Sequence, residues 1–180
     1  GEVAWNLINK KIPDLIISDI MMPNMDGFEL CQLIKSTFQT SHIPVILLTA
    51  LSDKTKQLEG LGLGADDYIT KPFDITVLTK RIESILKNRE IVRERTLKMI
   101  NATGNKENVF SNELNDRFIK KALDIVRKNI DNSEFGKDEF ASAMNVSPSL
   151  LYQKMKNLTG QSPIEFIKAI RFNYASELLQ

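Results

Sequence analysis

The sequence predicts two folded parts, an α/β domain built on a parallel sheet and an all-α domain that follows it. Short apolar runs alternate with helical patterns in the first part, and every pattern after residue 113 is helical. The charge balance changes as well. Residues 1–90 carry 10 basic and 12 acidic side chains and residues 91–180 carry 14 and 11, which gives net charges of −2 and +3. We therefore expect two domains with different partners.

The composition, with 42% hydrophobic and 26% charged residues among 180, allows the chain to bury a core. No run approaches the roughly 18 consecutive apolar residues of a membrane span, and the first residues lack a signal-peptide pattern. The chain as given is expected to be soluble and cytoplasmic, without membrane contact. Its single cysteine, Cys31, lies in an apolar helical stretch and is expected to be a buried structural thiol.

Three strands are expected in the first part. The apolar runs 15–17 and 45–48 each follow a proline and are too short for core helices, so both are predicted to be strands buried on both faces. A third strand is expected over 67–70. Helical patterns over 28–38 and 54–61 lie between them, the second ending at Gly62 and Gly64. This alternation predicts parallel strands joined by crossover helices.

The second half begins with a long helix. Its apolar positions from Ile75 to Leu86 lead into the charged stretch 87–95 and the polar tract 101–108, which is the expected linker. From Glu113 onward one apolar face recurs every four residues. The predicted boundaries are a domain over 1–90, a charged helix and linker over 91–112, and a helical domain over 113–180.

Each expected strand ends on a different polar residue, namely Asp19, Thr49 and Lys71. Because ligands bind at the carboxyl ends of parallel strands, the fold is expected to bring all three to one rim. A carboxylate nucleophile, a hydroxyl donor and a cation suit phosphoryl transfer. We expect Asp19 to attack a phosphohistidine, Lys71 to neutralise the phosphoryl oxygens, and Thr49 to bind one of them afterwards.

Three motifs carry a family resemblance: PDLIISDIMMPNMDG at 13–27, PVILLTA at 44–50 and GADDYITKPF at 64–73. Together they resemble the CheY-like response-regulator receivers, whose fold is flavodoxin-like, over about residues 1–90. The resemblance implies a histidine kinase as phosphoryl donor and no enzyme activity for this chain. It also implies a Mg²⁺ ion held partly by Asp19 and the backbone carbonyl of Met21, and a switch role for Tyr68.

The match departs from the family at its start. Residues 1–5 resemble the second receiver helix, so the first two strands, one of which supplies an acidic metal-binding pair, are absent from this chain. Asp14 lies about 16 Å from Asp19 along its strand, and Asp66 and Asp67 also lie at the wrong end of theirs. Asp26 and Asp53 remain candidate outer contacts. We expect an incomplete, unstable Mg²⁺ site and little phosphoryl labelling of this chain by itself.

The missing strands also leave 15–18 as an exposed sheet edge, and such edges recruit partners. Two outcomes stay open. The edge pairs with a second copy of the chain, giving a homodimer, or it is covered by a further N-terminal piece of the intact protein.

The pattern over 138–159 is typical of a helix-turn-helix. A helix over 138–144 and a turn at 145–147 precede a second helix over 148–159, in which Ser147 is a good N-cap and Gly160 a good terminator. A third helix opens with the capping-box pattern of residues 162–165. The expected core comprises Phe140, Ala141, Met144, Val146, Leu151, Met155 and Leu158.

The second helix is expected to enter the major groove of duplex DNA. Gln153 can pair with adenine, and the basic side chains can neutralise phosphates. The expected DNA contacts are Ser147, Ser149, Tyr152, Gln153, Lys154, Lys156, Lys168 and Arg171.

The stretch VSPSLLYQKMKNLTGQSPIEFIKAIR at 146–171 resembles the first half of an AraC-type DNA-binding domain, over about residues 111–180. That family has two helix-turn-helix units, and this chain stops at Gln180, inside the helix expected to join them. Gln153 stands where relatives often have arginine. The two domains together resemble the C-terminal part of the hybrid two-component sensors of Bacteroidetes. This implies a kinase-containing parent anchored in the inner membrane and control of polysaccharide-utilisation genes.

Two other functions could use the same residues. A phosphorelay or protein-interaction module would use the same receiver without contacting DNA. A phosphatase with an aspartyl nucleophile is disfavoured, because such sites need a second carboxylate close after the first and Ile20 and Met21 occupy that place.

Overall fold

A computed structural model describes residues 1–50, 63–101 and 112–179. It describes the side chains of all these residues except 95–101. The chain divides into two compact units, residues 1–88 and 89–180. The expected helix over 54–61, Asp53 and most of the linker lie outside the described residues. Within the described ranges, no helix combines the length and apolar character needed to cross a membrane.

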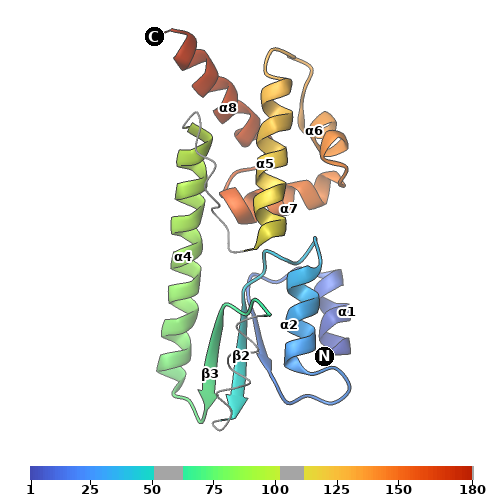
Figure 1. Cartoon of the computed structure of the whole chain (residues 1–180), viewed down its shortest axis with the longest axis vertical. Coiled ribbons are helices and arrows are strands. Elements are labelled where there is room, and N and C mark those ends of the chain that lie inside the picture. The colour runs from blue at the N-terminus through green and yellow to red at the C-terminus, as the bar shows by residue number, and fades with distance from the viewer. Residues whose placement is uncertain (51–62, 102–111, 180) are drawn as a thin grey trace. The chain divides into compact units, whose positions relative to one another are not determined.

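The first unit is built on three parallel strands, β1 (Ile16–Asp19), β2 (Val45–Ala50) and β3 (Asp67–Lys71). Their order is β1-β2-β3, which confirms the predicted parallel sheet. In Figure 1 the sheet lies between α1 (Glu2–Lys10) and α2 (Gly27–Ser36) on one side and the first half of α4 (Ile75–Asn101) on the other. This layering leaves the carboxyl ends of all three strands at one rim.

The core of this unit lies between α2 and the sheet. Leu30, Cys31 and Ile34 are at most 1% exposed and pack in one cluster with Val45 and Leu47 of β2. Burying a side chain of this size stabilises the fold by about 1.5–3 kcal/mol. Burial also raises the pKa of the Cys31 thiol to about 11, so it is protonated and unreactive, as the sequence predicted.

The opposite face of the sheet is covered unevenly. Ile46 and Ile69 are buried there, and Arg81 of α4 pairs with Asp67 of β3 at 3.3 Å. Ile17 of β1 is 40% exposed. The expectation that this strand is buried on both faces is therefore wrong for the described chain, because α4 covers β2 and β3 but leaves β1 open.

The second unit contains α5 (Glu113–Lys128), α6 (Lys137–Met144), α7 (Pro148–Thr159) and α8 (Pro163–Leu178). Phe140 of α6 stacks on Phe166 of α8 with ring centroids 6.2 Å apart. The expected core positions are buried, apart from Val146, which is half-buried. Helix starts follow the predicted chemistry, since Ser147 accepts from the Leu150 amide and Ser162 forms a capping box.

Candidate functional site

The rim of the sheet holds an ion pair between its two outer strands. The Lys71 ammonium donates to the Asp19 carboxylate, and the Met21 amide donates to Asp19 Oδ1 at 3.3 Å. The hydrogen bond from Lys71 is the main cause that lowers the pKa of Asp19 below its ordinary value of 3.8. Asp19 is thus an ionised carboxylate at neutral pH, half-exposed at the surface, which is the state a nucleophile requires.

The loop after β1 holds Asp19 in place through backbone contacts. The Ile20 amide donates to the Leu48 carbonyl at 3.0 Å, and the Gly27 amide donates to the Ile20 carbonyl at 2.9 Å. Gly27 opens α2 so close to the strand that an added Cβ would lie 2.3 Å from the Asp19 carbonyl oxygen. Only glycine fits there without a shift of the backbone that carries Asp19.

Thr49 lies on the same rim at the end of β2. It is 8% exposed, and its hydroxyl donates to the Ala50 carbonyl at 3.2 Å. The structure therefore brings Asp19 and Lys71 into contact, with Thr49 on the strand between them. The peptide bond from Lys71 to Pro72 is cis.

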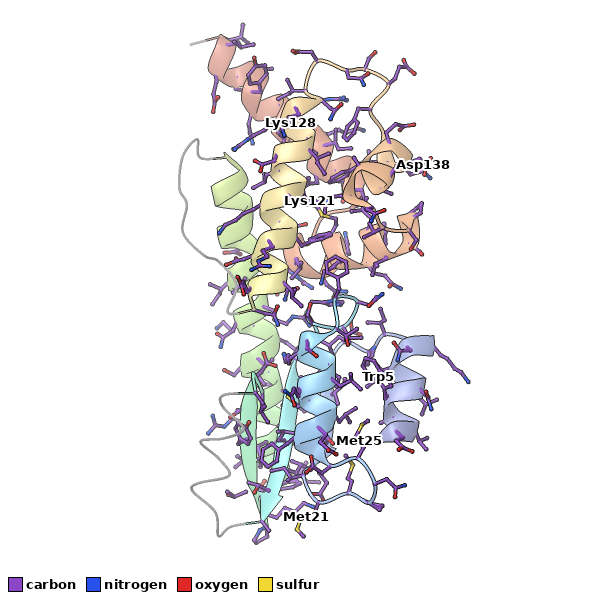
Figure 2. All side chains as sticks on the ribbon, turned by 45° about the vertical axis from the view of Figure 1, so that its right-hand side comes forward. Trp5, Met21, Met25, Lys121, Lys128 and Asp138 are labelled. Atoms are coloured by element: carbon purple, nitrogen blue, oxygen red, sulfur yellow. The ribbon has the colours of Figure 1, made fainter. Side chains whose placement is uncertain are left out.

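The described acids at this rim do not by themselves form a Mg²⁺ site. Mg²⁺ requires near-octahedral coordination by oxygen ligands, so a single carboxylate leaves most of the coordination positions to other groups. Asp19 offers one, and Met21 lies at the end of the sheet toward which the strand arrows point (Figure 2). Asp26, a candidate outer contact, instead accepts from the Glu29 amide at 2.8 Å as the cap of α2. Nowhere in 1–50, 63–101 or 112–179 do three or more His, Cys, Asp or Glu gather to hold a metal.

Two of the acids considered, Asp66 and Asp67, have structural roles away from the rim. Asp66 accepts from Lys35 at 2.6 Å and from the Val45 amide at 2.8 Å. Asp67 pairs with Arg81, as described above. Neither supplies a ligand near Asp19, in agreement with their positions at the amino end of β3.

Tyr68 of β3 packs against the α2 core cluster and is half-buried. Its hydroxyl is buried, and no group in the described residues hydrogen-bonds to it. Burial, with a smaller contribution from Cys31, raises the pKa of the phenol to about 12. A buried hydroxyl without a partner is unfavourable, so this polar atom offsets part of the stability that the packed ring contributes.

The second unit presents α7 after a three-residue turn. Asn145 ends α6 in the left-handed conformation at φ 61°, and Gly160 ends α7 at φ 76°. The exposed side of α7 carries Ser149, Tyr152, Gln153 and Lys156. Tyr152 is 51% exposed, which leaves its ring available to a ligand. Lys168 of α8 and Ser147 are also exposed.

Two expected DNA contacts are contradicted. Lys154 is fully buried, and its ammonium donates to Asn115 Oδ1 at 3.0 Å instead of reaching solvent. Arg171 is half-buried, and its guanidinium donates to the carbonyls of Asn132 and Phe135 between α5 and α6. The full burial of Lys154 contradicts its expected role as a phosphate contact, and the Arg171 guanidinium is held by two backbone carbonyls.

Sequence reasoning missed Gly27 and the inward position of Lys154. Lys154 lies three residues after Leu151 and four before Leu158, which is the spacing of one buried helix face. That signal was available but was outweighed by the charge of the side chain. Gly27 carries no local signal, because its requirement comes from the approach of α2 to β1.

Comparison with known proteins supports the expected resemblance of the first unit to receiver domains. Residues 1–83 match the family described as response regulator receiver domain. The chain is 39% identical over all 180 residues to Histidine kinase P4 of Formosa agariphila, and it spans 13% of that protein. It is 37% identical over 138 residues to the heme response regulator HssR of Staphylococcus epidermidis, which covers 75% of this chain and 54% of that protein.

Among solved structures, a signal receiver domain of a signal transduction histidine kinase from Syntrophus aciditrophicus is 45% identical. The match covers 47% of this chain and 64% of that chain, with a TM-score of 0.44. The chain thus spans about an eighth to about half of the relatives' lengths given above.

Proposed function

We propose that residues 1–83, which match the response regulator receiver domain family, act as a receiver, and that phosphorylation of Asp19 controls sequence-specific DNA binding by the helical unit. The observation that supports the receiver chemistry most is the contact between the Asp19 carboxylate and the Lys71 ammonium at the rim. It places an ionised oxygen nucleophile beside a cation that can stabilise the incoming phosphoryl group.

In the proposed reaction, a carboxylate oxygen of Asp19 bonds to the phosphorus of a phosphohistidine on a histidine kinase. The phosphorus–nitrogen bond breaks, and the released imidazole nitrogen keeps the electron pair and takes a proton. Lys71 then pairs with the phosphoryl oxygens instead of the carboxylate. Thr49 rotates from the Ala50 carbonyl to donate to one of them, and Tyr68 changes position as the rim contracts.

Receiver domains use Mg²⁺ for this chemistry, where the ion neutralises phosphoryl charge. In this chain Asp19 and the Met21 carbonyl are the proposed contacts. Since Asp19 is the one carboxylate that the described residues offer for this contact, we propose that waters, phosphoryl oxygens and acids outside the described residues complete the coordination.

The DNA-binding part of the proposal rests on the exposed side of α7. Gln153 can form paired hydrogen bonds with adenine in the major groove, and Lys156 and Lys168 can neutralise phosphates. The short turn at Asn145 and the capped start of α7 at Ser147 are typical of a helix-turn-helix, and the AraC type is proposed from the sequence resemblance over 146–171.

The wider setting is proposed by analogy with the hybrid two-component sensors of Bacteroidetes. The chain would be the cytoplasmic output part of a longer protein with a histidine kinase and an inner-membrane anchor, and it would activate polysaccharide-utilisation genes. The match over the full chain to a protein named as a histidine kinase supports this setting. The edge of the sheet formed by β1 is the proposed dimer contact, and gel filtration showing a stable monomer would contradict it.

The test of regulation is duplex binding with and without a phosphodonor. The intact protein that contains this chain is mixed with acetyl phosphate and Mg²⁺ and titrated onto a duplex enriched from a random-sequence pool. We expect the donor to change the affinity of the wild type but not of Asp19→Asn, while Asp14→Asn responds as the wild type does. An equal response in Asp19→Asn would contradict the proposal.

A phosphorelay or protein-interaction module without DNA contact is the second candidate. It predicts no mobility shift on any duplex, even in low salt. The exposed polar face of α7 favours neither candidate by itself, so this measurement decides between them.

A further inference from the structure

A buried lysine joins α7, the helix proposed to contact DNA, to α5. Lys154 and Met155 of α7 are both fully buried, whereas the preceding residue, Gln153, is exposed. A fully buried lysine is rare, because moving an ammonium group away from water is costly unless the group is hydrogen-bonded. Its presence here calls for a reason that a leucine or methionine would not satisfy.

The contacts of Lys154 are directional. Nζ donates to Asn115 Oδ1 at 3.0 Å and lies 5.5 Å from the centre of the Phe118 ring. Asn115 and Phe118 are both buried on the first two turns of α5, so the side chain spans from α7 to one defined point on α5. Burial lowers the pKa of Lys154 to about 7, and the amine is a hydrogen-bond donor in either protonation state.

A second lysine hydrogen-bonds α6, the first helix of the proposed helix-turn-helix, to α5. Lys121 of α5, labelled in Figure 2, donates to the Met144 carbonyl at 3.0 Å. Met144 is the last residue of α6, directly before the turn. Helix α5 is therefore hydrogen-bonded to both helices of the motif. Its Lys121 donates to the end of α6, and its Asn115 accepts from Lys154 of α7.

We propose that Lys154 is a positioning residue of the DNA interface: its hydrogen bond to Asn115 sets the orientation of α7, and it contacts no phosphate. This inference rests on the proposed DNA-binding function. Reading a base edge requires the side chain to lie within about 0.5 Å of its place. Gln153 is next to Lys154 on the same helix, so a rotation of α7 on α5 displaces it directly.

The test compares Lys154→Met with Lys156→Met, which removes the same charge two residues further along α7. The probes are the duplex that the wild-type chain enriches from a random-sequence pool, and the unselected pool. For Lys154→Met we expect about a tenfold loss of preference for the enriched duplex, since one paired base contact is misplaced, with an unchanged salt dependence. For Lys156→Met we expect both probes to weaken equally and the slope of log K against log salt to fall by about one.

A double variant separates orientation from folding. Asn115→Leu with Lys154→Met replaces the buried polar pair by apolar groups of similar size, which often leaves stability unchanged or higher. We expect the double variant to give the circular dichroism spectrum of the wild type, which shows that it is folded. We also expect it to lose preference for the enriched duplex as Lys154→Met does.

Three results would overturn the inference. One is full preference in a folded double variant, and another is a reduced salt slope in Lys154→Met, which would make Lys154 a phosphate contact. Both leave DNA binding intact. A wild-type chain that binds neither probe in low salt would instead overturn the proposed function, and the inference with it.

Discussion

The Lys71 ammonium contacts the Asp19 carboxylate, so the last residue of β3 reaches the last residue of β1 across the end of β2. This contact places a compensating positive charge at the proposed phosphoacceptor before any phosphoryl group arrives. The two side chains are 41% and 37% exposed, so the pair contributes little to stability and is free to rearrange.

Replacing Lys71 by methionine should raise the pKa of Asp19, because the hydrogen bond from Lys71 is the largest cause of its lowering. A carboxyl group with a lowered pKa in the folded state stabilises the fold above its unfolded pKa, and this contribution is lost as the pH falls through the folded pKa. Acid destabilisation below about pH 4 should therefore be weaker in Lys71→Met. Carboxyl-carbon NMR titration measures the shift directly. Lys80→Met, which removes an exposed cation paired with Glu83, should leave the pKa of Asp19 unchanged.

Gly27→Ala should destabilise the first unit by about 1–3 kcal/mol, because the new Cβ meets the Asp19 carbonyl at 2.3 Å and both groups are backbone-bound. Urea unfolding followed by the fluorescence of Trp5, the single tryptophan, reports on this unit. Gly136→Ala in the second unit is the control and is followed by circular dichroism, since its Cβ would meet only the tip of the Glu139 side chain at 3.2 Å. Equal stability of Gly27→Ala and the wild type would show that α2 can move away from β1 freely.

Tyr68→Phe should be as stable as the wild type or up to about 1 kcal/mol more stable, because it removes a buried hydroxyl that has no partner in the described residues. Tyr68→Ala should cost on the order of 3 kcal/mol, since it also removes the ring from the core. The same urea and fluorescence measurement compares the two. A large loss in Tyr68→Phe would mean that the hydroxyl is bonded in solution.

Lys154 should make stability rise with pH between about 7 and 10.5, the folded and ordinary values of its pKa. In that range the unfolded chain binds a proton that the folded chain does not, so each increase in pH favours folding. In Lys154→Met this part of the rise should disappear. Thermal unfolding followed by circular dichroism from pH 6 to pH 10 compares the variants, and identical slopes would contradict the lowered pKa.

The three strands, the caps at Ser147 and Ser162 and the left-handed turn at Asn145 could be predicted from sequence, because each depends on residues close together in the chain. The meeting of Asp19 and Lys71 could also be predicted, since parallel strands end at one rim. The exposure of Ile17 could not, because it depends on which strands α4 covers.

Lys154 and Arg171 show a different limit of prediction from sequence, because the hydrogen-bond partners of both lie far away in the chain. The positive charges of Lys154 and Arg171 predict exposed side chains, because lysine and arginine are almost never fully buried unless paired. Their partners are Asn115 and two backbone carbonyls, 39 and 36–39 residues away in sequence, and such partners become visible only once the helices are packed.

The claim that Asp19 is the phosphoacceptor is tested most directly by locating the modified residue. The chain is treated with acetyl phosphate and Mg²⁺, reduced with borohydride to convert an aspartyl phosphate into homoserine, and sequenced by mass spectrometry. We predict a low yield of homoserine at position 19, where Asp14→Asn has no effect and Asp19→Asn abolishes it. Homoserine at another aspartate, or phosphoryl label that persists in Asp19→Asn, would contradict the account.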